Sequence, residues 1–110
     1  MIKRLLAVDG VMAVVLFRDD GVYLEGYGMM SEEQMRGLGQ FAHDYKRLVQ
    51  ASADQLSMFT QMSGWTPPQG WIVRAPEFTV CSMANLVCVT QNSGTDLSEV
   101  MSELKELAHY

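Results

Sequence analysis

The chain has 110 residues, of which 48% are hydrophobic and 19% are charged, and a chain of this length forms one domain because a second core would leave each half too small. The 13 acidic and 8 basic residues give a net charge of -5, which repels nucleic acid phosphates and anionic lipid. No apolar run approaches the ~20 residues that cross a bilayer, and no export signal is recognised. We therefore expect one cytoplasmic domain over residues 1–110, with no affinity for nucleic acid and no membrane insertion.

The first predicted elements are a short helix and a β-hairpin. Apolar residues recur at helical spacing over residues 2–8, ahead of Gly10, and glycine commonly follows a helix end. Residues 11–17 form an apolar run rich in β-branched residues, and an Asp-Gly pair separates it from the apolar segment 22–27, which indicates a hairpin. Because the first run has no polar face, we expect it to be a strand with helices on both sides.

A long helix is predicted to start at Ser31 and to end by Gly64. Ser31 and Gln34 form a capping box, in which each side chain can bond the other residue's backbone amide. From Met35 to Met62, apolar residues alternate steps of three and four, which places them on one stripe of a helix. Consecutive prolines shortly after Gly64 cannot donate backbone hydrogen bonds, so the helix cannot continue through them.

Three short strands and a last helix are predicted in the remainder of the chain. The strand candidates are residues 71–75, 78–83 and 86–90. Ala84 and Asn85 form the turn between the last two strands, since asparagine tolerates left-handed backbone geometry. Apolar residues over 97–108 then form one face of a helix. The resulting order is helix, two strands, long helix, three strands, helix, which is an α/β (α+β) arrangement.

The beginning of the chain resembles a known family. Residues 5–15 read LLAVDGVMAVV, and the hairpin turn that follows, residues 18–21, reads RDDG. With the order of the predicted elements, these residues resemble the roadblock light-chain family of dynein and of bacterial GTPase-regulating proteins. The chain looks like an uncharacterised prokaryotic member of that superfamily.

The resemblance implies both a fold and a function. The fold is roadblock/profilin-like, with a five-stranded antiparallel sheet, the long helix on one face and the terminal helices on the other. Family members commonly form homodimers or heterodimers through the long helix and an edge strand. They act as scaffolds or regulators, often of small GTPases, and have no catalytic residues. The resemblance therefore implies a homodimeric, noncatalytic scaffold or regulatory domain that needs no cofactor. Its unidentified protein partner would be either a small GTPase or a multi-protein complex.

Two groups of residues are candidates for contacts with other chains. The loop from residue 65 to 71 places two indoles on a proline-rich segment, and tryptophan is enriched at interface hot spots. The candidate partner-binding residues are Trp65, Pro67, Pro68 and Trp71. The alternative is that both rings cover the end of the sheet, and burial is the favoured alternative for Trp71 because it begins a strand.

The long helix provides the second group. Phe41, Leu48 and Met58 lie partly off its main apolar stripe, so one small domain leaves apolar surface that a dimer would cover. The candidate dimer-interface residues are Met35, Leu38, Tyr45, Leu48 and Phe59.

Cys81 and Cys88 are expected opposite each other on neighbouring strands, across the predicted turn. Two cysteines are too few for a secreted disulfide framework. They are either buried thiols, the usual state of cysteine, or a redox pair. An alternative function is therefore a redox- or small-molecule-sensing domain that uses the cysteines and a pocket between sheet and helix.

No pattern for catalysis or metal binding emerges. His43 and Asp44 are adjacent and are not expected to face each other on a helix. The glycine segments lack the P-loop and GxGxxG patterns of phosphate-binding loops, and neither a CxxC pattern nor a nearby histidine completes a metal site around the cysteines. The sequence predicts no catalytic, cofactor-binding or metal-binding residue.

Overall fold

The computed structural model describes the backbone of residues 2–60 and 70–108, and the side chains of residues 2–52 and 70–108. The elements in chain order are η1 (Ile2–Ala7), β1 (Val11–Phe17), β2 (Tyr23–Gly28), α1 (Glu32–Thr60), β3 (Gly70–Arg74), β4 (Phe78–Met83), β5 (Leu86–Gln91) and α2 (Leu97–Ala108). The predicted order is confirmed, and the strand boundaries differ by no more than one residue. The first helix is a 3-10 helix of six residues, the tighter form that short helical segments often take.

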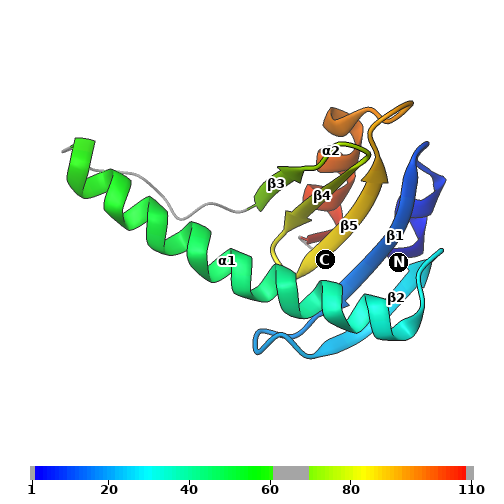
Figure 1. The fold of residues 1–110 in the computed structure, drawn as a ribbon, viewed down its shortest axis with the longest axis horizontal. Coiled ribbons are helices and arrows are strands. Elements are labelled where there is room, and N and C mark those ends of the chain that lie inside the picture. Colours follow the sequence, from blue (N-terminus) through cyan, green and yellow to red (C-terminus); the bar gives the residue numbers. More distant parts are fainter. Residues whose placement is uncertain (1, 61–69, 109–110) are drawn as a thin grey trace.

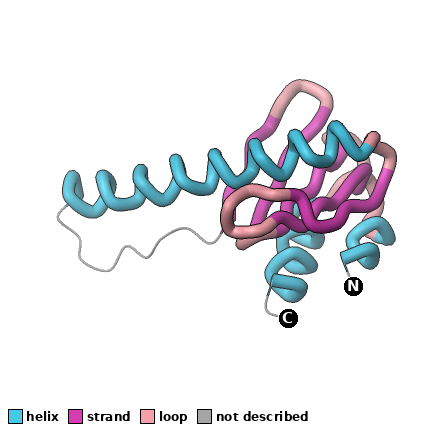
Figure 2. Tube along the Cα trace, turned by 90° about the horizontal axis from the view of Figure 1, so that it is seen from below, coloured by secondary structure: helices cyan, strands magenta, loops and turns pink. Residues whose placement is uncertain are grey.

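The five strands form one antiparallel sheet in the order β2-β1-β5-β4-β3. Helix α1 crosses one face of the sheet, and η1 and α2 lie on the other face (Figures 1 and 2). This is the arrangement that the resemblance implied, and it is confirmed. Strands β2 and β3 are the two edges, so β1 lies inside the sheet.

Two apolar clusters, one on each face of the sheet, hold the layers together. The cluster under α1 consists of Ala13, Val15, Phe17, Met35, Ala42, Trp71 and Val87. The cluster under η1 and α2 consists of Ile2, Leu5, Val8, Val14, Cys81, Leu86, Cys88, Val100, Leu104 and Leu107. Successive residues of β1 therefore enter opposite clusters, as the alternation of side chains along a strand requires. The prediction that this strand is covered on both sides is confirmed.

Helix α1 begins with the predicted capping box and is longer than the sheet that it covers. The Gln34 amide donates to the Ser31 hydroxyl over 3.1 Å, and the Ser31 amide donates to the Gln34 side-chain oxygen over 3.0 Å. At 1.5 Å per residue, 29 residues extend about 43 Å. The first half of the helix lies on the sheet, whereas the second half projects past the β3 edge (Figures 1 and 2).

The turn between β4 and β5 lies where it was predicted, but its geometry differs. Ala84, and not Asn85, has the left-handed backbone conformation, with φ of 53°. The Asn85 side chain has another role, because its carbonyl oxygen accepts a hydrogen bond from Lys46 Nζ over 3.1 Å and its amide donates to Asp19 Oδ1 over 2.8 Å. Asn85 thus connects the turn to α1 and to the β1-β2 hairpin.

Candidate functional site

An aromatic cluster joins α1 to the edge strand β3. The rings of Phe41 and Tyr45 are stacked with centroids 5.7 Å apart, and the Trp71 ring lies 4.7 Å from Tyr45 and 5.8 Å from Phe41. Trp71 is only 9% exposed, and its indole N–H has no hydrogen-bond partner among the described residues. Apolar burial and ring contacts therefore hold Trp71 in place.

The burial of Trp71 removes it from the residues that we consider for partner binding. The favoured alternative, that this ring covers the sheet, is confirmed by its low exposure. The other members of that group, Trp65, Pro67 and Pro68, lie outside the described residues. Their role in partner binding stays a prediction.

Two large apolar side chains of α1, one of them the cluster member Phe41, are exposed. Phe41 is 39% exposed and Leu48 is 63% exposed, and a separation of seven residues places both on the same side of a helix. Leu38 and Tyr45 pack partly against the core. Met35 is buried in that core, so its side chain is not available for contact with another chain. The side chain of Phe59 lies outside the described ones.

Strand β3 gives this surface an unpaired backbone edge. Its residues pair with β4 on one side, and no described strand pairs with its other side. Ile72 on this strand is 46% exposed, and Phe78 at the beginning of β4 is 40% exposed. A strand with an open edge is a template for pairing with a strand of another chain.

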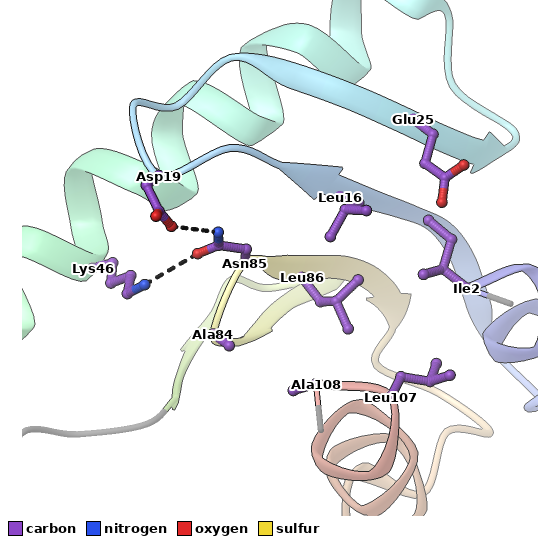
Figure 3. A pocket seen from close by; sticks show the side chains of 10 residues that line it. All are labelled: Ile2, Leu16, Asp19, Glu25, Lys46, Ala84, Asn85, Leu86, Leu107 and Ala108. Atoms are coloured by element: carbon purple, nitrogen blue, oxygen red, sulfur yellow. Dashed lines mark hydrogen bonds between the residues drawn. The ribbon is translucent and has the colours of Figure 1, made fainter. Parts of the chain in front are cut away.

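A pocket of about 530 Å³ lies between η1, the β4-β5 turn and the end of α2 (Figure 3). We call it the amphipathic pocket. Its apolar lining comes from Ile2, Leu16, Ala84, Leu86, Leu107 and Ala108, and its polar lining from Asp19, Glu25, Lys46 and Asn85. Figure 3 shows Glu25 on one side of the apolar residues and the hydrogen-bonded Lys46, Asn85 and Asp19 on the opposite side.

The charges around this pocket are arranged unequally. Lys46 and Asp19 are bridged by Asn85, so a positive and a negative group lie close together at that end. Glu25 accepts a hydrogen bond from the Tyr27 hydroxyl over 3.3 Å. The negative charge of Glu25, followed by burial and this hydrogen bond, raises the pKa of Tyr27.

A smaller pocket of about 330 Å³ lies on the α1 side of the Lys46–Asn85–Asp19 bridge. It is lined by His43, Lys46, Arg47 and Gln50 of α1, with Phe17, Asp19 and Asn85. The expectation that His43 and Asp44 do not meet is wrong, since His43 Nδ1 lies 3.1 Å from Asp44 Oδ1. The two side chains lean together along the helix surface, where Gln40 also donates to Asp44. Among the described residues, the lining of this pocket contains His43 but no serine, threonine, cysteine or tyrosine.

Cys81 and Cys88 are paired directly across β4 and β5, as the sequence predicted. Both are fully buried and unbridged, inside the cluster under α2. The hydrogen bond with Cys81, together with burial, raises the pKa of the Cys88 thiol. Among the described residues, neither cysteine lines the amphipathic pocket or the smaller pocket. A sensing role for the two thiols stays a prediction.

We expect both thiols to resist labelling in the folded protein. A charged alkylating reagent needs an exposed thiolate, whereas each of these side chains is 0% exposed. Mass spectrometry after a short exposure to iodoacetate should show no added label under native conditions and two labels in denaturant. Rapid native labelling of either cysteine would contradict this prediction and would favour a redox role.

Within the described side chains, no group of three histidine, cysteine, aspartate or glutamate residues is placed to hold a metal ion. Among the helices of the described residues, none combines the length and the apolar character that crossing a membrane requires.

Comparison with known proteins identifies the fold. A protein-family model described as "Uncharacterized conserved protein (DUF2173)" matches residues 1–106. No curated protein matches the chain. The structure superposes on a roadblock/LC7 domain from Streptomyces avermitilis with a TM-score of 0.82 and 12% identity, covering 97% of this chain and 87% of the other.

Two further solved structures have the same fold. MglB from Myxococcus xanthus matches with a TM-score of 0.72 and 14% identity over 94% of this chain and 81% of that chain. A structure described as MglB with tetrameric arrangement matches with a TM-score of 0.74 and 16% identity over 94% of this chain and 76% of that chain. The roadblock fold that the opening residues suggested is therefore confirmed.

Proposed function

The chain belongs to the DUF2173 family of uncharacterised conserved proteins, and from its roadblock fold we propose that it is a noncatalytic domain that forms a homodimer and binds another protein. The observation that carries this proposal is the long α1, whose second half projects beyond the sheet (Figure 2). In water, most of the stability of a helix comes from packing of its apolar face against another surface. A second copy of the chain can provide that surface.

Two neighbouring features support a dimer through α1 and β3. Leu48 is 63% exposed and Phe41 is 39% exposed on α1. The Phe41 ring contacts Trp71 of β3, and no described strand pairs with the outer edge of β3. Pairing of two β3 edges would extend the sheet and place each projecting helix near the partner's apolar surface. A solved structure of this fold is described as MglB with tetrameric arrangement. Self-association of that protein supports our proposal that this chain also self-associates.

Sedimentation equilibrium of the untagged chain tests the dimer. The monomer mass is 12.3 kDa, and we expect a species of twice that mass at tens of micromolar. A stable interface buries roughly 800 Å² per partner, which is the area that a dimer through α1 and β3 has to cover. A single species of monomer mass at that concentration would refute the dimeric part of the proposal.

Our proposal for the class of partner protein rests on the roadblock fold and on no contact in the structure. Regulators of small GTPases occur among the proteins that the opening residues resemble, so a small GTPase is the first class of partner to test. The loop that contains Trp65, Pro67 and Pro68 stays the sequence-based candidate for this contact. Affinity capture from the native lysate, compared between the wild type and Trp65→Ala, should show one partner that only the wild type retains. We propose that this interaction occurs in the cytoplasm.

A further inference from the structure

We propose that the amphipathic pocket binds a small organic amine: a molecule with an apolar body that lies on Leu16, Leu86 and Leu107 and with a protonated amino group that meets Glu25. This binding site is separate from the proposed dimer surface and goes beyond the proposed function. The pocket is lined by residues of η1, β1, β2, α1, β5 and α2, and of the β1-β2 and β4-β5 turns.

The size and lining of the pocket favour a small molecule with an apolar body. A volume of about 530 Å³ falls in the range of ligand pockets, which are mostly apolar with a few convergent polar groups. Leu86 is 3% exposed and Leu107 is 6% exposed, so the apolar floor is held by the core and does not depend on loose side chains. The floor is therefore preformed.

The charges of the pocket select the polar group of the ligand. None of the pocket's charged groups forms an ion pair among the described residues. Lys46 and Asp19 each have a hydrogen bond with Asn85, over 3.1 and 2.8 Å, and their opposite charges lie at the same end, whereas Glu25 has only the longer hydrogen bond from Tyr27, over 3.3 Å. The nearby cation Lys3 is placed over the Tyr27 ring, 4.9 Å from its centroid. A carboxylate beside an apolar surface attracts an ammonium group and disfavours an anion.

The position of Lys46 orients the ligand. Lys46 and Glu25 lie on opposite sides of the apolar lining (Figure 3). Like charges repel, so Lys46 directs an ammonium group away from its own end and toward Glu25. The apolar body then extends from Glu25 across Leu16 and Leu86.

Titration of the full chain with hexylamine, hexanol and hexanoate tests the proposal. The amide NMR shifts that change on titration should belong to Leu16, Glu25, Leu86 and Leu107. Hexylamine should bind about fivefold more tightly than hexanol, because its ammonium group forms a half-buried ion pair with Glu25. Hexanoate should bind more weakly than hexanol. Lengthening the amine from butyl to hexyl should tighten binding about two- to fourfold per methylene.

Glu25→Gln provides the decisive variant, and Glu33→Gln is its matched control. Both remove one negative charge, but Glu33 lies on the exposed first turn of α1, away from the pocket lining. Glu25→Gln should make hexylamine and hexanol bind equally, while Glu33→Gln should leave their ratio unchanged. Equal weakening by both variants, equal binding of the two ligands to the wild type, or shifts that map outside the pocket would each overturn the proposal.

Discussion

Replacing Leu48 by glutamate is expected to convert the proposed dimer into a monomer without unfolding the domain. Leu48 is 63% exposed in the single chain, so the substitution buries no charge in the monomer. In a dimer through α1, the new carboxylate would be buried without a partner, and an uncompensated buried charge costs several kcal/mol. The dissociation constant should rise about 100-fold or more, measured by sedimentation equilibrium over a concentration series.

Leu24→Glu is the control for this experiment. Leu24 is 50% exposed on β2, the edge strand opposite β3, and the substitution makes the same chemical change. The Leu24 variant should dimerise as the wild type does, and both variants should unfold with similar midpoints. If Leu24→Glu dissociated the dimer and Leu48→Glu did not, the interface would lie on the β2 edge and our assignment to α1 would be wrong.

Gly28→Ala is expected to reduce the free energy of unfolding by about 3 kcal/mol or more. Gly28 ends β2 with φ of 131°. Residues that carry a Cβ atom rarely adopt this backbone conformation. A Cβ at this position would lie 2.6 Å from the Ala13 Cα and closer still to the Met12 carbonyl oxygen. Because both neighbours are backbone atoms of β1, the sheet has to move to accommodate the methyl group. Urea denaturation measures the loss.

Gly37→Ala is the matched substitution, with the opposite expected sign. Gly37 lies in α1 with open space around the position of an added Cβ, and alanine is favoured over glycine inside a helix by about 1 kcal/mol. The variant should be more stable than the wild type by up to that amount. A Gly28→Ala protein as stable as Gly37→Ala would show that the close contact between β2 and β1 relaxes freely.

The elements of the fold were predictable because their signals are local. The β-branched run at 11–17 and the capping box at Ser31 each specify a strand or a helix start through neighbours a few residues away. Both were confirmed. The turn at Ala84 and Asn85 was predicted for the same reason, but the left-handed residue was assigned to Asn85. Ala84 has that conformation instead, while the Asn85 side chain bonds Lys46 and Asp19, which are far away in the sequence.

The candidate surfaces were predictable only in part. Leu48 and Phe41 were recognised as apolar residues off the main stripe, and both are exposed. Met35 and Trp71 were included among the contact residues, but they lie in the core. The spacing of apolar residues shows which of them share a face of a helix or strand. It does not show how far the neighbouring layer covers that face. The residues that line the amphipathic pocket were not predicted, because they come from segments that are spread from Ile2 to Ala108.

The sequence by itself determined the order of helices and strands, the apolar faces that they present and the pairing of Cys81 with Cys88 across a two-residue turn. Only the tertiary structure decided which apolar residues stay uncovered, that Asn85 bridges Lys46 to Asp19, and that Glu25 lies beside an apolar pocket. The physical reason is the range of the interactions. Hydrogen bonding and side-chain periodicity act within a few residues, whereas coverage, charge environment and pockets depend on segments that meet only after folding.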